Sequence, residues 1–169
     1  MELLPGFAAQ VFGRGPDGLA ILMSSIGFGG SVAGLWLAHR GQTGGLTKLV
    51  TLSLLISGVS LALFTVTGYI WLAACFLVSV GFFMLLGGIS SQTLMQNAVD
   101  SAMRARVMSL FVVISWGLPA FGALAEGWLA SLVGLQPVVA AGALVAIVMW
   151  LWARPAGRRL AAELERAGS

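Results

Sequence analysis

Long apolar segments separated by short polar ones make up most of this sequence. Residues 49–99 contain no Asp, Glu, Lys, Arg or His, and residues 107–153 contain a single charged side chain, Glu126. As one helix the first run would be about 76 Å long, whereas the hydrocarbon core of a bilayer is about 30 Å thick. It must therefore fold back, and residues 65–68, Thr-Val-Thr-Gly, are the turn that we expect. The pattern predicts helices that cross a membrane.

The same pattern predicts an all-α membrane protein with five complete spans and one truncated first helix. The complete spans are residues 19–38, 49–67, 69–89, 107–133 and 138–153. Pro119 lies inside the fourth span and lacks a backbone donor, so we expect a kink there. Residues 1–13 supply only about 12 apolar positions, roughly 18 Å of helix, which is too short to cross. We interpret them as the second half of a helix whose first half is missing.

The polar segments predict the orientation of these spans. Residues 13–18 form a turn, and residues 39–48 and 92–106 form polar loops. Placing both loops and the C-terminal tail on one side collects every basic residue there except Arg14. Because loops rich in Lys and Arg stay in the cytoplasm, we expect a bacterial cytoplasmic-membrane protein with its C-terminus in the cytoplasm. Its parts would be a transmembrane domain over residues 1–154 and a charged cytoplasmic tail over residues 155–169.

Composition supports the membrane class and argues against several other classes. Hydrophobic residues make up 59% of the chain and charged residues 9%, too few for the surface of a soluble domain. The net charge of +3 comes from basic residues at loop ends rather than one patch, so we expect no nucleic-acid partner. With one cysteine, Cys75, one histidine and no catalytic motif, we expect no disulfide, metal, cofactor or enzymatic activity.

Small residues recur at helical spacing in the first complete span. Gly27, Ser31 and Gly34 lie on one face, with Gly30 beside them, and Gly30 and Gly34 form a GxxxG pair. Such faces let another helix approach closely. Glycine is common throughout the chain, so a chance arrangement is the alternative. Pro119 and Gly122 form a second candidate packing element.

Glu126 is the main candidate for chemistry, because it is the only ionisable side chain inside a complete span. A charge at the bilayer centre costs a few kcal/mol on insertion scales, so such residues usually face a cavity or a partner. Glu126 is therefore a candidate for proton titration or for contact with a cationic or polar substrate. The alternative is a structural carboxylate that reaches the interface or hydrogen-bonds a neighbouring helix. Trp116 and Gln92 are weaker candidates.

Several motifs together resemble the major facilitator superfamily, most closely its enterobactin-exporter and macrolide-efflux-like branch. Residues 96–110, with Arg104-Ala105-Arg106-Val107, resemble the loop between the tenth and eleventh helices, where the family usually has glycine in place of Ala105. Residues 34–41 are similar to the superfamily's loop motif, with His39 where the N-terminal copy has aspartate. The other matching stretches are residues 3–5 with 13–30, similar to the seventh and eighth helices, and Gly117-x-Pro119-x-x-Gly122, similar to the kinked eleventh helix.

The resemblance implies the C-terminal half of a transporter, helices seven to twelve, with the seventh cut short. It implies proton-coupled efflux of a small amphipathic compound, of the drug or siderophore class. Loop charges that hold the closed state would be Asp100, Arg104 and Arg106, with Arg40 in the other loop; a solvated basic loop is the alternative. The expected partners are lipid, a small-molecule substrate, and the missing N-terminal half or a second copy. A truncated membrane protein without transport activity remains the competing hypothesis.

Overall fold

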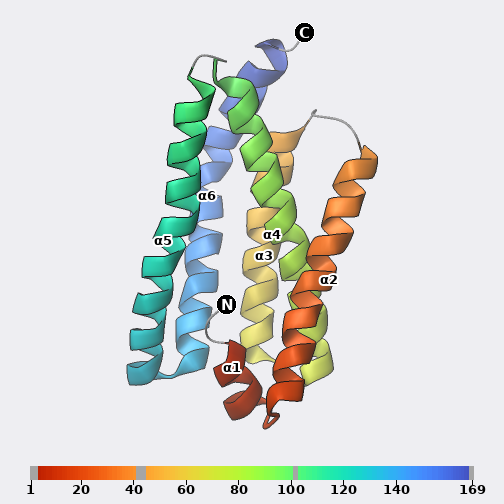
Figure 1. The fold of residues 1–169 in the computed structure, drawn as a ribbon, viewed down its shortest axis with the longest axis vertical. Helices are drawn as coiled ribbons and strands as arrows, with labels where there is room; N and C mark the ends of the chain where they lie inside the picture. Colours follow the sequence, from red (N-terminus) through yellow and green to blue (C-terminus); the bar gives the residue numbers. More distant parts are fainter. Residues whose placement is uncertain (1–3, 41–44, 101–102, 168–169) are drawn as a thin grey trace.

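The computed structural model describes residues 4–40, 45–100 and 103–167, and side chains as far as Trp152 with the exception of Trp116. All regular secondary structure in this part of the chain is helical (Figure 1). The elements are α1 (Leu4–Gly6), the π-helical η1 (Phe7–Val11), α2 (Pro16–Arg40), α3 (Leu46–Val66), α4 (Ile70–Ala98), α5 (Arg104–Val133) and α6 (Leu135–Ala167). Five of them, α2 to α6, are long and apolar enough to cross a membrane, which confirms the predicted helical membrane class.

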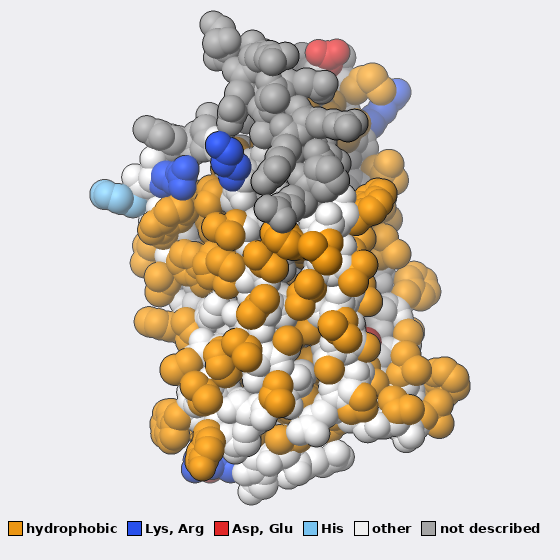
Figure 2. Space-filling view, turned by 180° about the vertical axis from the view of Figure 1, so that it is seen from behind, with side chains coloured by type: hydrophobic (Ala, Val, Ile, Leu, Met, Phe, Trp, Pro, Cys, Tyr) orange, Lys and Arg blue, Asp and Glu red, His pale blue; other side chains and the backbone are white. Residues whose placement is uncertain are grey.

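The five long helices form a bundle in which α4 has the most neighbours. It packs against α2 on one side and α3 on the other, α3 also packs against α6, and α5 lies at the edge, mainly against α6 (Figure 1). The ends of α2 and α4 and the starts of α3 and α5 lie at the same end of the bundle as the last turns of α6 (Figure 1). Hydrophobic side chains cover the face between the two ends, and Lys and Arg side chains lie at the ends (Figure 2). That distribution suits a bundle whose middle lies in lipid.

Several helices are longer than the hydrophobic pattern predicted. α4 continues to Ala98 and α5 begins at Arg104, so most of the predicted 92–106 loop is helical and the connection is only residues 99–103. α6 begins at Leu135 and runs through Pro155 to Ala167, so the predicted tail continues the last span. The predicted boundaries were wrong because polar residues end a span's contact with lipid without ending its backbone hydrogen bonding. A proline removes only one such bond in a long helix.

The close approach between α2 and α4 depends on Gly29 and Gly81, not on the predicted small-residue face. Both glycines are buried. A Cβ on Gly29 would overlap the Val78 carbonyl oxygen, and a Cβ on Gly81 would overlap that of Ile26. The two backbones therefore touch at a point where only glycine fits.

The predicted small-residue face has little part in this packing. Gly27 and Ser31 are exposed, and a Cβ on Gly27 would meet nothing within 4 Å. Gly30 and Gly34 are half-buried, and a Cβ on either would lie 3.8–3.9 Å from the Leu85 side chain, an ordinary contact distance. Within this chain, Gly27 and Ser31 lie on a face of α2 that turns away from α4. Their use by another helix stays a prediction.

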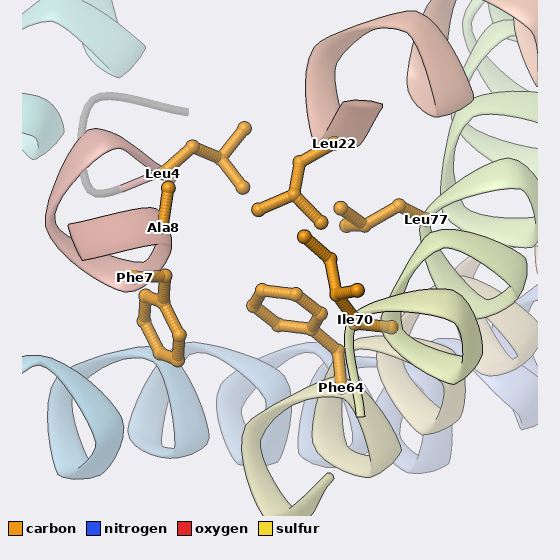
Figure 3. Close-up of a cluster of buried hydrophobic side chains, with 8 residues drawn as sticks. Leu4, Phe7, Ala8, Leu22, Phe64, Ile70 and Leu77 are labelled. Carbon is orange, nitrogen blue, oxygen red and sulfur yellow. The ribbon is translucent and has the colours of Figure 1, made fainter. Parts of the chain in front are cut away.

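The short N-terminal helices close one end of the bundle. Leu4, Phe7 and Ala8 are buried together with Leu22, Phe64, Ile70, Ala73 and Leu77, which come from α2, α3 and α4 (Figure 3). The rings of Phe7 and Phe64 lie 4.9 Å apart between centroids, in a tilted arrangement that is favourable for aromatic pairs. Gly6 lies against Leu135 at the start of α6. The segment is helical, as predicted, and is packed between the ends of the long helices.

Candidate functional site

An apolar cavity of about 260 Å³ opens between the helices, beside the aromatic pair Phe7 and Phe64. Every helix from α1 to α6 contributes to its wall, so the cavity is created by the fold rather than by one segment. Its lining residues are Leu4, Phe7, Ile26, Leu61, Phe64, Leu77, Val80, Met84, Glu126, Val139 and Gly142. Of these, only Glu126 has a polar side chain. The sequence candidate and the cavity therefore meet at one place.

Glu126 reaches the cavity from the edge helix α5. It lies seven residues before Val133, the last residue of α5, which places it about 10 Å along the axis from that end. It is exposed in the isolated chain. Gly122 and Ala130, one turn before and one turn after it, are half-buried, so Glu126 lies on the face of α5 that turns toward the rest of the bundle. The carboxylate thus lies within a helix long enough to cross a membrane and borders an apolar space.

The charges that could neutralise Glu126 lie elsewhere. Among the described side chains, those of Lys and Arg belong to the helix ends and connections: Arg14, Arg40, Lys48, Arg104 and Arg106. Arg40 stacks over the Trp36 ring at 5.2 Å from its centroid, which directs that guanidinium to its own helix end. Among the described residues that line the cavity, none is cationic.

The predicted gating charges gather at the end of the bundle where α2 finishes and α5 begins. Asp100, Arg104 and Arg106 are exposed, and Arg40 is half-buried. Asp100 precedes α5, and its carbonyl oxygen accepts a hydrogen bond from the Met103 N–H at 3.0 Å. Asp100 therefore precedes Arg104, the first residue of α5. Their role in gating stays a prediction.

The remaining sequence candidates add little to the cavity. Gln92 is exposed near the end of α4, and Pro119 is exposed on α5, which continues through it as one helix. Gly122 is half-buried, but a Cβ there would meet nothing within 4 Å. The candidate Trp116 has a side chain outside the described residues. Pro119 and Gly122 are therefore not packing contacts within the described part of this chain.

Hydroxyl groups between α3 and α4 were not anticipated from the sequence. Ser60 Oγ and Ser79 Oγ lie 2.9 Å apart and share a hydrogen bond, which joins the two helices inside the apolar bundle. Ser53 and Ser90 are also buried, and their hydroxyls have no hydrogen-bond partner among the described atoms. The available signal was the presence of Ser53, Ser60 and Ser79 within the predicted apolar spans, since polar side chains there usually face other helices.

Comparison of the chain with protein-family models, with curated proteins and with solved structures finds no match. The resemblance to the major facilitator superfamily therefore depends on the sequence motifs alone.

Proposed function

We propose that this chain is one half of a secondary-active transporter of the major facilitator type, which exports a small amphipathic compound in exchange for protons. The observation that supports this best is that Glu126, on a helix long enough to cross a membrane, is the one carboxylate among the described residues lining an apolar cavity, and that none of those residues is cationic. An ionisable group inside a membrane span is costly and usually belongs to a substrate or proton pathway. The sequence motifs at residues 34–41 and 96–110 support the family.

The exposure of α5 supports the presence of a second transporter half that packs against this helix. None of the described side chains of α5 is buried, although the helix is long enough to span and carries Glu126. In transporters of this type, two six-helix halves enclose a path at the bilayer midplane and rock against each other. A second half placed over α5 would enclose Glu126 and complete the cavity wall.

In this proposal Glu126 alternates between two neutralising partners. A proton on the carboxylate removes its charge while the cavity is empty, and the proton leaves when substrate enters. Because the two occupants compete for one group, proton movement in one direction drives substrate in the other. The basic residues at the α2–α3 and α4–α5 connections would stabilise the closed state at that end through exposed contacts, each worth under about 1 kcal/mol.

Reconstitution in liposomes tests the proposal. The chain alone should give no flux of substrate under an imposed pH gradient, because one half leaves its cavity open to lipid. The chain reconstituted together with an N-terminal six-helix half should exchange substrate for protons, and Glu126→Gln should abolish this exchange without lowering the amount of protein. Flux from the chain alone would favour a homodimer of half-size units and would contradict the need for a different second half.

A further inference from the structure

We propose that the cavity beside Glu126 binds a small lipophilic monovalent cation with an aromatic part. The resemblance allows drugs, siderophores and other compounds as substrates, whereas the cavity wall discriminates among them. The inference names the substrate class for the proposed transport site, and rests on the proposed function for its biological meaning. Binding itself is measurable at equilibrium, without transport.

The charge of the wall selects the charge of the ligand. Glu126 is the only ionisable one of the described residues that line the cavity, and no Lys, Arg or His is among them. An anionic ligand would face a carboxylate with nothing to neutralise it, at a depth where bringing like charges together is expensive. A cation would instead supply the charge that the carboxylate lacks. One carboxylate matches one positive charge.

The rest of the wall selects the body of the ligand. Apart from Glu126 the lining side chains are aliphatic, aromatic or thioether, including Phe7, Phe64 and Met84, and Gly142 adds none. Such a wall offers no hydroxyl or amide to a sugar or another ligand with many polar groups, and burying those groups unpaired costs free energy. Aromatic faces favour quaternary ammonium groups, and methionine adapts to irregular shapes.

The part of the cavity that this chain supplies sets the scale of the ligand that the chain alone can hold. Its volume of about 260 Å³ lies just below the range of roughly 300–1,000 Å³ that is usual for small-molecule sites. A compound with a single ring and a compact ammonium group suits this space better than a macrocycle. Benzyltrimethylammonium is the probe that these properties indicate. Its carbon isostere neopentylbenzene, which has the same shape without the charge, is the matched neutral control.

Equilibrium binding of radiolabelled benzyltrimethylammonium to the purified full chain in lipid nanodiscs tests the proposal. We expect saturable binding that excess unlabelled cation competes away and that neopentylbenzene does not. Glu126→Gln should weaken binding tenfold or more, whereas Glu126→Asp, which keeps the charge, should retain most of it. The control Asp17→Asn removes an exposed carboxylate from the first turn of α2 and should leave binding unchanged. Equal binding to the wild type and Glu126→Gln, or equal competition by the neutral isostere, would overturn the proposal.

A second measurement needs no variant and covers the case in which Glu126→Gln does not fold. Dicyclohexylcarbodiimide reacts with carboxyl groups in apolar surroundings, and peptide mass spectrometry locates the adduct. Benzyltrimethylammonium should protect Glu126 from this reagent in the wild-type chain, and neopentylbenzene should not. Labelling that the cation leaves unchanged would overturn the site. If the cation binds but the two-half assembly shows no proton-driven flux, only the transport function is contradicted. If the assembly shows proton-driven flux of another substrate and the cation does not bind, only this inference is contradicted.

Discussion

Replacing Gly29 by alanine tests the contact that joins α2 to α4. A Cβ at this position would overlap the Val78 carbonyl oxygen and stand 2.9 Å from the Phe82 backbone nitrogen. Both neighbours are backbone atoms of α4, so no side-chain rotation can relieve the overlap. The two helices must separate, and the contacts beside Gly29 loosen with them.

The expected cost follows from two opposing effects. Alanine is a better helix former than glycine by about 1 kcal/mol, which favours the variant. Overpacking at a close contact costs about 1–3 kcal/mol, and more where backbone atoms are the obstacle. We therefore expect a net loss of about 1–2 kcal/mol in the free energy of unfolding for Gly29→Ala. Gly81→Ala should behave alike, since it meets the Ile26 backbone. The double variant should cost less than the sum, because the first alanine has already separated the helices.

Unfolding in detergent micelles, followed by circular dichroism against added denaturing detergent, measures the effect. The matched control is Gly27→Ala, on the same helix but with nothing within 4 Å of its Cβ position. This control should be as stable as the wild type or slightly more stable. If Gly29→Ala were as stable as Gly27→Ala, the close approach of α2 and α4 at Gly29 would be refuted.

Two further predictions concern the core and the orientation. Phe64→Ala should lower the free energy of unfolding by about 3 kcal/mol, because Phe64 is 2% exposed within the aromatic and aliphatic cluster. The control Phe121→Ala should change it far less, because Phe121 is 73% exposed. Equal losses in a detergent unfolding series would contradict the assigned core. In a Cys75→Ala background, Gly44→Cys should react with an impermeant maleimide only after the cells are opened, whereas Gly68→Cys should react in intact cells. The opposite result would reverse the predicted orientation.

The spans could be predicted from the sequence because hydrophobic length is set by the thickness of the bilayer. Residues 49–99 had to fold back, and α3 and α4 meet at the expected turn. The face of α2 that packs could not be predicted in the same way. In lipid, residues facing a neighbouring helix and residues facing the membrane are both apolar, so the pattern along α2 does not distinguish Gly29 from Gly27.

Of the candidate site, the sequence could supply Glu126 but not its surroundings. A lone carboxylate in a span is visible in the pattern of charges. The cavity wall, however, combines side chains from every helix from α1 to α6, and these come together only through long-range packing. Phe7 shows the difficulty most clearly. It belongs to a segment too short to span, yet it is 1% exposed and lines the cavity.

The central claim is that one carboxylate exchanges a proton for a cationic substrate, and proton release on binding tests it most directly. Benzyltrimethylammonium is added to the purified chain in weakly buffered detergent solution, and a pH indicator follows the protons released. The account predicts release approaching one proton per bound cation when Glu126 is protonated beforehand, and no release from Glu126→Gln. Binding of the cation to the protonated wild-type chain without proton release, or equal release from Glu126→Gln, would contradict the account.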